Sequence, residues 1–344
     1  MIASARFSHP AGGFAVTSPQ PEKLVIWAVS DGKAGNAAPS LGLAEAVARR
    51  RPAEIVVKTV GWKGFSGRLP WWLVPAPRLW LDGASGMSPP WPDLWIATGR
   101  ATLPLDMAVR RWSGGRTFVV HVQDPRAPAS AFDLVVAPRH DGIEGPNVLK
   151  ITGSPHRVTP DRLAADRARF AATIDPLPHP RTAVLVGGRS KAHDLSPERA
   201  AALADQIGAA IEREGGSLLL TFSRRTPEPA KAAFRARLGA LPGQMWDGEG
   251  DNPYFAFLDA ADVILATEDS ANMATEAAAV GRPLHILPLD GGSPKFRRFH
   301  ADLQSRGVAR PFNGDLTPWP CEPLNETERA ADEIVRRLEL RRQR

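Results

Sequence analysis

The stretch NPYFAFLDAADVILATEDSANMATEAAAVGRPLHILPL, residues 252–289, alternates between helical and strand-like patterns. Its centre, DVILATE (262–268), is a continuous apolar run of the kind that forms strands buried on both faces of a parallel sheet. An Ala-rich helix follows, Gly281 and Pro283 stop it, and PLHILPL (283–289) forms the next strand. This order predicts a βαβ unit of an open α/β sheet, which binds ligands at the carboxyl ends of its strands.

Similar apolar runs form two series along the chain, with helical patterns such as 41–50 and 197–216 between them. The Pro-rich segment IDPLPHPRT (174–182) separates the two series. We therefore expect an α/β protein with two Rossmann-like domains. The first series comprises 24–30, 54–60, 94–99, 117–122, 132–138 and 147–153, and the second comprises 183–188, 217–223, 262–268 and 283–289.

The domain boundaries follow from the composition between these runs. Residues 1–20 lack periodicity and are rich in Gly, Pro and Ser, which predicts a disordered leader. We expect a first domain over 21–165, a linker over 166–182 and a second domain over 183–323. Residues 324–344 predict a capped C-terminal helix with a basic tail.

Composition limits the partners and the compartment. The formal charge is +6, and the basic residues are mostly Arg, which suits phosphate recognition but is also what a GC-rich genome produces. No zinc-finger, RNP or helix-turn-helix signature is present, so we expect no nucleic acid partner. A single cysteine and the absence of a spanning apolar run or signal peptide predict a cytoplasmic protein.

Polar residues follow the strand at 262–268, where a ligand is expected. Asp269, Ser270 and Asn272 lie at the start of the next helix, whose free N–H groups form a ready anion site. Glu276 lies about one turn into that helix, where its carboxylate can accept hydrogen bonds from ribose hydroxyls. The alternative is an ordinary crossover with a capped helix.

Two further strand ends of the second domain carry groups suited to phosphate. Two glycines that permit close backbone approach follow the strand at 183–188, and hydroxyls and cations follow the strand at 217–223. Taken one at a time, these are tight turns or solvated arginines; together they predict one anion site. Its residues are Gly187, Gly188, Arg189, Ser223, Arg224, Arg225 and Thr226.

Three loops of the first domain carry candidate proton acceptors. SDGKAGN (30–36) contributes Asp31, HVQDPR (121–126) contributes Asp124, and PRHDG (138–142) contributes His140 and Asp141. A carboxylate or imidazole must take the acceptor's proton if a sugar is transferred with inversion. Each of these residues, taken alone, is also explained as structural, and the sequence does not rank them.

The motifs resemble one family over residues 24–330, the bacterial relatives of the plant mitochondrial-fission protein named for elongated mitochondria. This resemblance implies a glycosyltransferase-B-like fold, while the family's activity is not settled. One departure is Ala38 and Pro39, where we expect a Gln near the helix start. The motifs are SDGKAGN, PDLWIATGR, QDPR, FDLVVAPRHD, VLVGG, SRRTP, NPY and ATEDSANMATEAAAVGRP.

The segment 252–289 also resembles the donor-binding segment of glycosyltransferase-B enzymes, particularly the lipid-linked N-acetylglucosaminyl transferase of peptidoglycan synthesis. That resemblance implies that Glu276 grips the ribose of a nucleotide sugar. It also implies that the phosphate or sugar end is lined by Ser270, Asn272, Met273, Ala274 and Thr275.

Two hypotheses follow. The first is a metal-independent transferase with a nucleotide-diphosphate sugar as co-substrate, no tightly bound cofactor, an unknown acceptor, and the first domain on the acceptor side. The second is a non-catalytic adaptor acting at a membrane surface or on a protein partner. A nucleotide-sugar epimerase is disfavoured, because no GxxGxxG follows the first strand and Tyr254 lacks a YxxxK context.

An aromatic and basic stretch gives a reason to consider an anionic membrane as a partner. GWKGFSGRLPWWLVPAPRLWLDG (61–83) mixes tryptophans with cations, a combination favoured at membrane interfaces, although such rings also pack inside domains. The basic tail can likewise contact anionic lipid or be an ordinary solvated helix end. The sequence therefore leaves two predicted locations: free in the cytoplasm, or peripheral on the inner face of the membrane.

Overall fold

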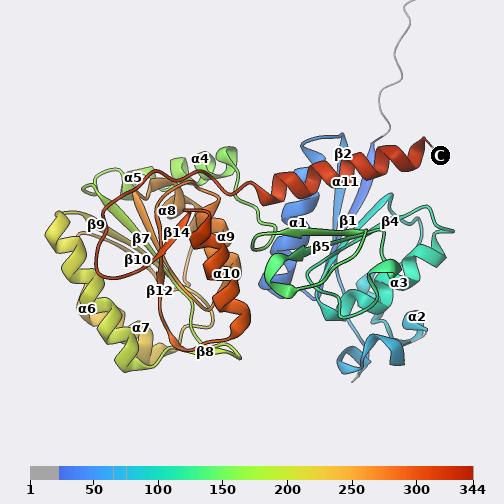
Figure 1. The fold of residues 1–344 in the computed structure, drawn as a ribbon. Helices are drawn as coiled ribbons and strands as arrows, with labels where there is room; N and C mark the ends of the chain where they lie inside the picture. The colour runs from blue at the N-terminus through green and yellow to red at the C-terminus, as the bar shows by residue number, and fades with distance from the viewer. Residues whose placement is uncertain (1–22, 65, 75, 344) are drawn as a thin grey trace, which may run out of the picture.

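The computed structural model describes residues 23–64, 66–74 and 76–343, so the predicted leader at 1–20 lies outside the described residues. The first domain is built on a parallel sheet of six strands in the order β2-β1-β3-β4-β5-β6 (Figure 1). These strands are β1 (Leu24–Ser30), β2 (Ala53–Thr59), β3 (Leu94–Thr98), β4 (Phe118–Val122), β5 (Leu134–Pro138) and β6 (Val148–Ile151).

The second domain repeats this plan in the order β10-β9-β7-β11-β12-β14, again with parallel pairing. Its strands are β7 (Arg181–Val186), β9 (Ser217–Phe222), β10 (Gly243–Trp246), β11 (Val263–Thr267), β12 (Leu284–Leu287) and β14 (Ala309–Pro311). A small antiparallel pair joins β8 (His193–Asp194) to β13 (Asp290–Gly291). The expected α/β class with two Rossmann-like sheets is confirmed.

Helices cover both faces of each sheet, which explains why the strands read as unbroken apolar runs. In the first domain these are α1 (Ala34–Ala48) on one face and α3 (Leu103–Trp112) on the other, with the short helix α2 (Pro77–Trp80) packed against α3. In the second domain, α6 (Pro197–Glu214) and α7 (Glu228–Leu238) cover one face. The opposite face carries α4 (Pro160–Arg169), α5 (Ala171–Ile174), α8 (Tyr254–Ala260), α9 (Ala271–Ala278) and α10 (Pro294–Ser305).

Local signals explain several helix ends, but the cap predicted for the C-terminal helix is not formed, because the Asn325 side chain makes no capping hydrogen bond. Ser196 caps α6 by accepting a hydrogen bond from the Arg199 N–H, and Gly215 ends the helix in the left-handed conformation with φ of 69°. Helix α1 begins at Ala34, earlier than the expected 41–50, and it contains Pro39. Proline lacks the N–H that would bond the carbonyl four residues earlier, so the Gly35 carbonyl is left free inside this helix.

The C-terminal helix α11 (Glu326–Arg342) returns to the first domain and lies across it (Figure 1). Its apolar side, with Ala331, Ile334 and Leu338, is buried against the first sheet and α1. Arginines of the predicted basic tail are partly used inside the protein: Arg336 and Arg337 pair with Glu333 at 2.7 and 2.6 Å. None of the helices in the described part of the chain is long and apolar enough to cross a bilayer.

Contacts between the two domains gather where the strands of both sheets end. Thr152 Oγ1 donates to Asp302 Oδ2 at 2.6 Å, and the Arg298 guanidinium donates to the His140 carbonyl at 3.2 Å. Figure 1 shows α9 and α10 on the side of the second domain that faces the first. The segment 166–182, predicted as a linker, contains the end of α4 and all of α5, and α4 packs on α8 of the second domain.

We expect Ile334→Ala to lower the free energy of unfolding by about 3 kcal/mol, since it leaves a cavity under α11. Ile334 is fully buried, whereas Leu340 on the same helix is 46% exposed. The matched control Leu340→Ala should change stability by less than about 0.5 kcal/mol. Urea unfolding of both variants checks this, and equal effects would show that α11 does not dock as described.

Candidate functional site

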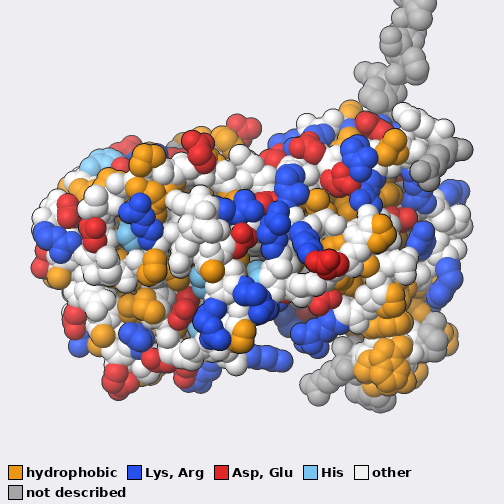
Figure 2. Space-filling model, in the orientation of Figure 1, with side chains coloured by type: hydrophobic (Ala, Val, Ile, Leu, Met, Phe, Trp, Pro, Cys, Tyr) orange, Lys and Arg blue, Asp and Glu red, His pale blue; other side chains and the backbone are white. Residues whose placement is uncertain are grey.

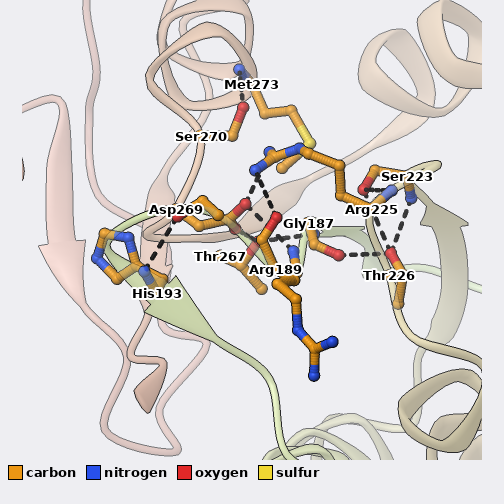
Figure 3. Close-up of polar contacts among 12 residues, drawn as sticks. Gly187, Arg189, His193, Ser223, Arg225, Thr226, Thr267, Asp269, Ser270 and Met273 are labelled. Atoms are coloured by element: carbon orange, nitrogen blue, oxygen red, sulfur yellow. Dashed lines mark hydrogen bonds and ion pairs between the residues drawn. The ribbon is translucent and has the colours of Figure 1, made fainter. Parts of the chain in front are cut away.

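Three strand ends of the second domain are held together by Asp269, whose side chain is fully buried. Its carboxylate accepts hydrogen bonds from the Gly188 N–H at 3.1 Å and the Thr267 hydroxyl at 2.7 Å. It also pairs with the Arg225 guanidinium at 2.7 Å (Figure 3). Asp269, predicted to bind ligand, is thus surrounded by internal partners, and it joins the loops that follow β7, β9 and β11.

The two glycines after β7 are required by this packing. A methyl group at Gly187 would overlap Asp269 Oδ1, and one at Gly188, whose φ is 150°, would overlap the Arg225 carbonyl oxygen. Thr226 completes the arrangement by donating to the Val186 carbonyl at 3.0 Å. The glycines therefore allow close approach of neighbouring loops, whatever else they contact.

The cations and hydroxyls of these loops point in different directions. The Arg225 guanidinium extends over Asp269 toward Ser270 and Met273, while Arg189 points away (Figure 3) and pairs with Asp194 at 3.2 Å. Arg224 is exposed. Ser223 is partly buried, and its N–H donates to the Thr226 hydroxyl at 3.1 Å.

Helix α9 begins at the interdomain groove. Ser270 caps it by accepting from the Met273 N–H at 3.4 Å. Asn272 Nδ2 donates at 3.2 Å to the Gly35 carbonyl of the first domain, the same carbonyl that Pro39 leaves free. Ala274 and Thr275 are buried, so they pack inside instead of lining open space.

Glu276 is half-buried on α9, and its Oε2 accepts a hydrogen bond from the Tyr254 hydroxyl at 2.7 Å. Burial raises the pKa of Glu276 to about 7, against the opposing effects of that hydrogen bond and of the charges on Arg162 and Arg157. No hydrogen bond from the described residues reaches its Oε1. One oxygen of the predicted ribose ligand is therefore occupied by Tyr254, and Glu276 lines neither of the interdomain cavities described below.

The predicted proton acceptors of the first domain are already engaged. Asp31 accepts hydrogen bonds at 2.9 Å from the side chains of Asn36 and Lys33. Burial alone would raise the pKa of Asp31, but these hydrogen bonds outweigh it and hold the pKa below its usual range. Asp124 Oδ1 accepts from the Arg126 N–H at 2.8 Å.

His140 and Asp141 lie beside the second domain. Lys295 of α10 pairs with Asp141 Oδ1 at 2.5 Å, which neutralises a carboxylate whose side chain is only 6% exposed. Burial lowers the pKa of His140 to about 4, with the charge of Asp141 opposing and that of Lys295 adding to the shift. His140 is therefore neutral near pH 7.

Two adjoining cavities bring the four predicted bases of the first domain together with Asn272, whereas the other predicted binding residues of the second domain line neither of them. One, of about 430 Å³, is lined by Asp31, Asp124, Asp141 and Lys295 among others. The other, of about 200 Å³, is lined by His140, Asp141, Lys295 and Asn272. The loops of the first domain thus face α9 and α10 of the second across one groove, which Figure 2 shows as a seam with many basic side chains.

A histidine that the sequence analysis did not select lines the larger cavity. His121, at the end of β4, is 1% exposed, and its Nδ1 lies 2.8 Å from Oδ2 of the fully buried Asp106. Trp95 Nε1 and the Thr102 hydroxyl donate to the same carboxylate at 2.7 and 3.0 Å. Among the described residues, nothing is hydrogen-bonded to His121 Nε2.

This arrangement fixes the orientation of the ring. A carboxylate with two further donors accepts the Nδ1 proton, so Nε2 carries the lone pair and is the free basic nitrogen. The sequence signal was a histidine inside the apolar run TFVVHV and an aspartate inside the apolar helix LPLDMAV. Both are polar residues at positions where burial is otherwise expected.

Fold and groove together define a two-domain α/β protein of the glycosyltransferase-B shape. Residues 34–338 match the protein family described as Mitochondrial fission ELM1, and the chain belongs to that family. The family expected from the motifs is thereby confirmed.

Two relatives give the extent of the likeness. The chain is 29% identical over 277 residues to the "Mitochondrial fission protein ELM1" of Arabidopsis thaliana, a match covering 73% of this chain and 65% of the plant protein. It is 26% identical over 346 residues to an uncharacterized protein of Rickettsia prowazekii, covering 90% of this chain and 97% of that protein. The match therefore spans just under two thirds of the plant relative.

Solved structures share the fold at low identity. The UDP-GlcNAc 2-epimerase of Methanocaldococcus jannaschii superposes with a TM-score of 0.57 at 14% identity, over 93% of this chain and 100% of that one. The structure of the same enzyme in complex with UDP-GlcNAc and UDP superposes with a TM-score of 0.54, at the same identity and coverage. Because an epimerase has this fold, the absence of GxxGxxG and YxxxK does not argue against every class of epimerase.

The raised pKa of Glu276 predicts a pH dependence of stability. The folded protein holds this proton more tightly than the unfolded chain, whose ordinary value is 4.5. The stabilising contribution is therefore fully present below pH 4.5 and is lost as the pH rises through about 7. Relative to Glu276→Gln, the wild type should lose on the order of 3 kcal/mol across this range.

Urea unfolding at a series of pH values measures this difference. Glu249→Gln, which removes an exposed carboxyl, is the control and should follow the wild-type curve. A Glu276→Gln profile parallel to the wild type from pH 4.5 to about 8 would mean that the carboxyl is not held in this environment.

Proposed function

We propose that the chain is a metal-independent glycosyltransferase that binds a nucleoside-diphosphate sugar on its second domain and an acceptor on its first. The observation that carries the proposal is the groove in which loops at the strand ends of the first domain face the starts of α9 and α10 in the second. Asn272 to Gly35 at 3.2 Å and Lys295 to Asp141 at 2.5 Å join its walls. Donor and acceptor bound to opposite walls would have their reacting atoms in the same space.

The donor's diphosphate fits between the Arg225 guanidinium and the amino end of α9. Arg225 is 41% exposed and is held in place by Asp269, so its remaining N–H groups would donate to the diphosphate while the positive end of the helix supplies the field. Glu276 Oε1 offers an acceptor for ribose hydroxyls. The M. jannaschii enzyme, which has the same fold, binds UDP-GlcNAc and UDP, which supports this ligand class.

On the acceptor side, His121 Nε2 is the base we favour. It takes the proton of an acceptor hydroxyl while that oxygen forms a bond to the anomeric carbon. The bond from that carbon to the diphosphate breaks, and the leaving diphosphate carries the electron pair away between Arg225 and α9. Asp106 keeps His121 oriented and stabilises the imidazolium ion that forms.

The four bases predicted from the sequence fit this step less well. Asp141 is neutralised by Lys295, and hydrogen bonds hold the pKa of Asp31 low. Asp124 accepts a backbone hydrogen bond, and His140 has a pKa of about 4. They remain candidates that are tested beside His121. An adaptor that binds a nucleotide without turning it over remains the second hypothesis.

We expect His121→Gln to lower turnover by about 10²- to 10⁴-fold without weakening nucleotide binding, since a general base contributes that factor to the chemical step. Calorimetry against nucleoside diphosphates and their sugars first identifies the ligand. Release of nucleoside diphosphate then measures turnover, with acceptors offered as a lipid extract and as soluble sugars. Asp106→Asn should lower the rate and change its pH profile, and His179→Gln, at an exposed histidine, is the control.

The outcomes separate the hypotheses. Nucleotide binding without turnover by the wild type would support the adaptor, and a sugar whose configuration is changed at a ring carbon other than the anomeric one would indicate an epimerase. Full activity in His121→Gln would show that His121 is not the base, and the remaining candidates would be Asp31, Asp124, His140 and Asp141. No binding of any nucleotide would contradict the proposal as a whole.

A further inference from the structure

A third cavity, of about 480 Å³, adjoins the larger cavity of the groove and shares Gly67, Arg100 and Arg126 with it. Its remaining walls are largely apolar: Leu69, Pro70, Trp71, Trp72, Leu103 and Pro125. We call this cavity the tryptophan groove. A polar cavity that contains His121 therefore continues directly into an apolar one.

Exposed apolar side chains gather beside the tryptophan groove. Six large hydrophobic side chains are exposed among the described residues, and four of them belong to one short segment: Trp72 at 60%, Leu73 at 49%, Leu79 at 74% and Trp80 at 39%. Figure 2 shows hydrophobic side chains gathered in the region of α2, at the lower right. Such a patch marks a contact surface, and tryptophan is favoured at membrane interfaces.

Arg100 and Arg126, which line both the tryptophan groove and the larger polar cavity, are unpaired within the described part of the chain. The two lysines of the polar cavity differ from them, because Lys33 pairs with Asp31 at 2.9 Å and Lys295 pairs with Asp141 at 2.5 Å. No hydrogen-bond or ion-pair partner of the Arg100 or Arg126 guanidinium occurs among the described residues. These two side chains therefore offer their donors to a ligand.

The loop that follows β4, residues 123–126, has a strained backbone. Gln123 and Arg126 have φ of 81° and 50°, the two positive values outside glycine in the described part of the chain. Such conformations are unfavourable for residues other than glycine, and they gather at ligand sites. The strain lies in the loop that carries one of the two unpaired arginines.

From these observations we infer that the joined cavities bind a membrane lipid whose headgroup carries a phosphate and a free hydroxyl. The phosphate lies between Arg100 and Arg126, the hydroxyl reaches His121, and the hydrocarbon chain leaves through the tryptophan groove toward the exposed patch. The lipid is the acceptor of the transfer, so its chemical fate rests on the proposed function, while its binding does not.

The combination selects this ligand class. A soluble phosphorylated acceptor would use the arginines but leave the tryptophan groove and the patch without an occupant. A protein partner could cover the patch but would not need two unpaired guanidiniums beside a buried histidine. An anionic lipid would contact the two arginines, the tryptophan groove and the exposed patch together. Its charged headgroup is covalently joined to its apolar chain, just as the polar cavity continues into the apolar one.

Vesicle flotation tests the inference with the full-length protein. Vesicles of phosphatidylcholine with about a third phosphatidylglycerol, whose headgroup has a phosphate and hydroxyls, are compared with pure phosphatidylcholine. We expect wild-type binding to the anionic vesicles to be at least about tenfold stronger. R100Q/R126Q should lose most of this preference, and W72A/L79A should bind both kinds of vesicle weakly.

Matched controls lie outside the patch. Val57→Ala and Leu340→Ala remove exposed apolar side chains, at 57% and 46% exposure, and Arg111→Gln removes an exposed arginine of α3. These variants should bind as the wild type does. Far-ultraviolet circular dichroism and melting temperature establish that each variant is folded.

Equal binding of the wild type to both kinds of vesicle would overturn the inference, and so would an unchanged preference in R100Q/R126Q. Losses in the control variants as large as those in R100Q/R126Q and W72A/L79A would also overturn it. Complete release of the protein by millimolar glycerol phosphate would indicate a soluble ligand and would contradict the lipid site. Nucleotide calorimetry on the same samples keeps the two proposals apart. Vesicle binding without nucleotide binding contradicts only the transfer, and nucleotide binding without vesicle binding contradicts only the lipid site.

Discussion

Asp269 carries a charge with no solvent exposure at the point where β7, β9 and β11 end. A buried carboxylate is tolerated only when other groups replace its hydration, and here the Gly188 N–H, the Thr267 hydroxyl and the Arg225 guanidinium do so. Removing one partner would leave the charge uncompensated, so the three loops are fixed as one unit. The position of Arg225 beside α9, and with it the proposed diphosphate site, depends on this carboxylate.

The second constraint is the arrangement of the two domains. Parallel strands bring their carboxyl ends to one edge of each sheet, and in this chain that edge of the first sheet faces the starts of α9 and α10 of the second domain. Pro39 contributes through the hydrogen bond it cannot make, because the Gly35 carbonyl that it frees accepts from Asn272. The first turn of α1, which contains Gly35, therefore lies at a contact between the domains.

Much of the fold was predictable because parallel strands buried on both faces produce apolar runs, as in 252–289, which forms α8, β11, α9 and β12. The location of the groove followed from the strand ends. The direction in which each side chain points could not be predicted in this way. Asp269 was therefore predicted to contact a ligand, although its hydrogen-bond and ion-pair partners lie inside the protein. His121 and Asp106 are 15 residues apart on different elements, and neither lies in a polar loop, so local patterns could not pair them. The C-terminal helix was predicted from its sequence, but the domain that it covers was not.

The central claim is that one groove receives a nucleotide on the second domain opposite an acceptor site on the first. Hydrogen–deuterium exchange, measured with and without the best-binding nucleoside-diphosphate sugar, tests it most directly. The account predicts slower exchange in 187–189, 223–226 and 269–273, together with a weaker effect in 31–36 across the groove. Protection confined to surfaces away from these loops, such as α6, α7 or α11, would contradict the account.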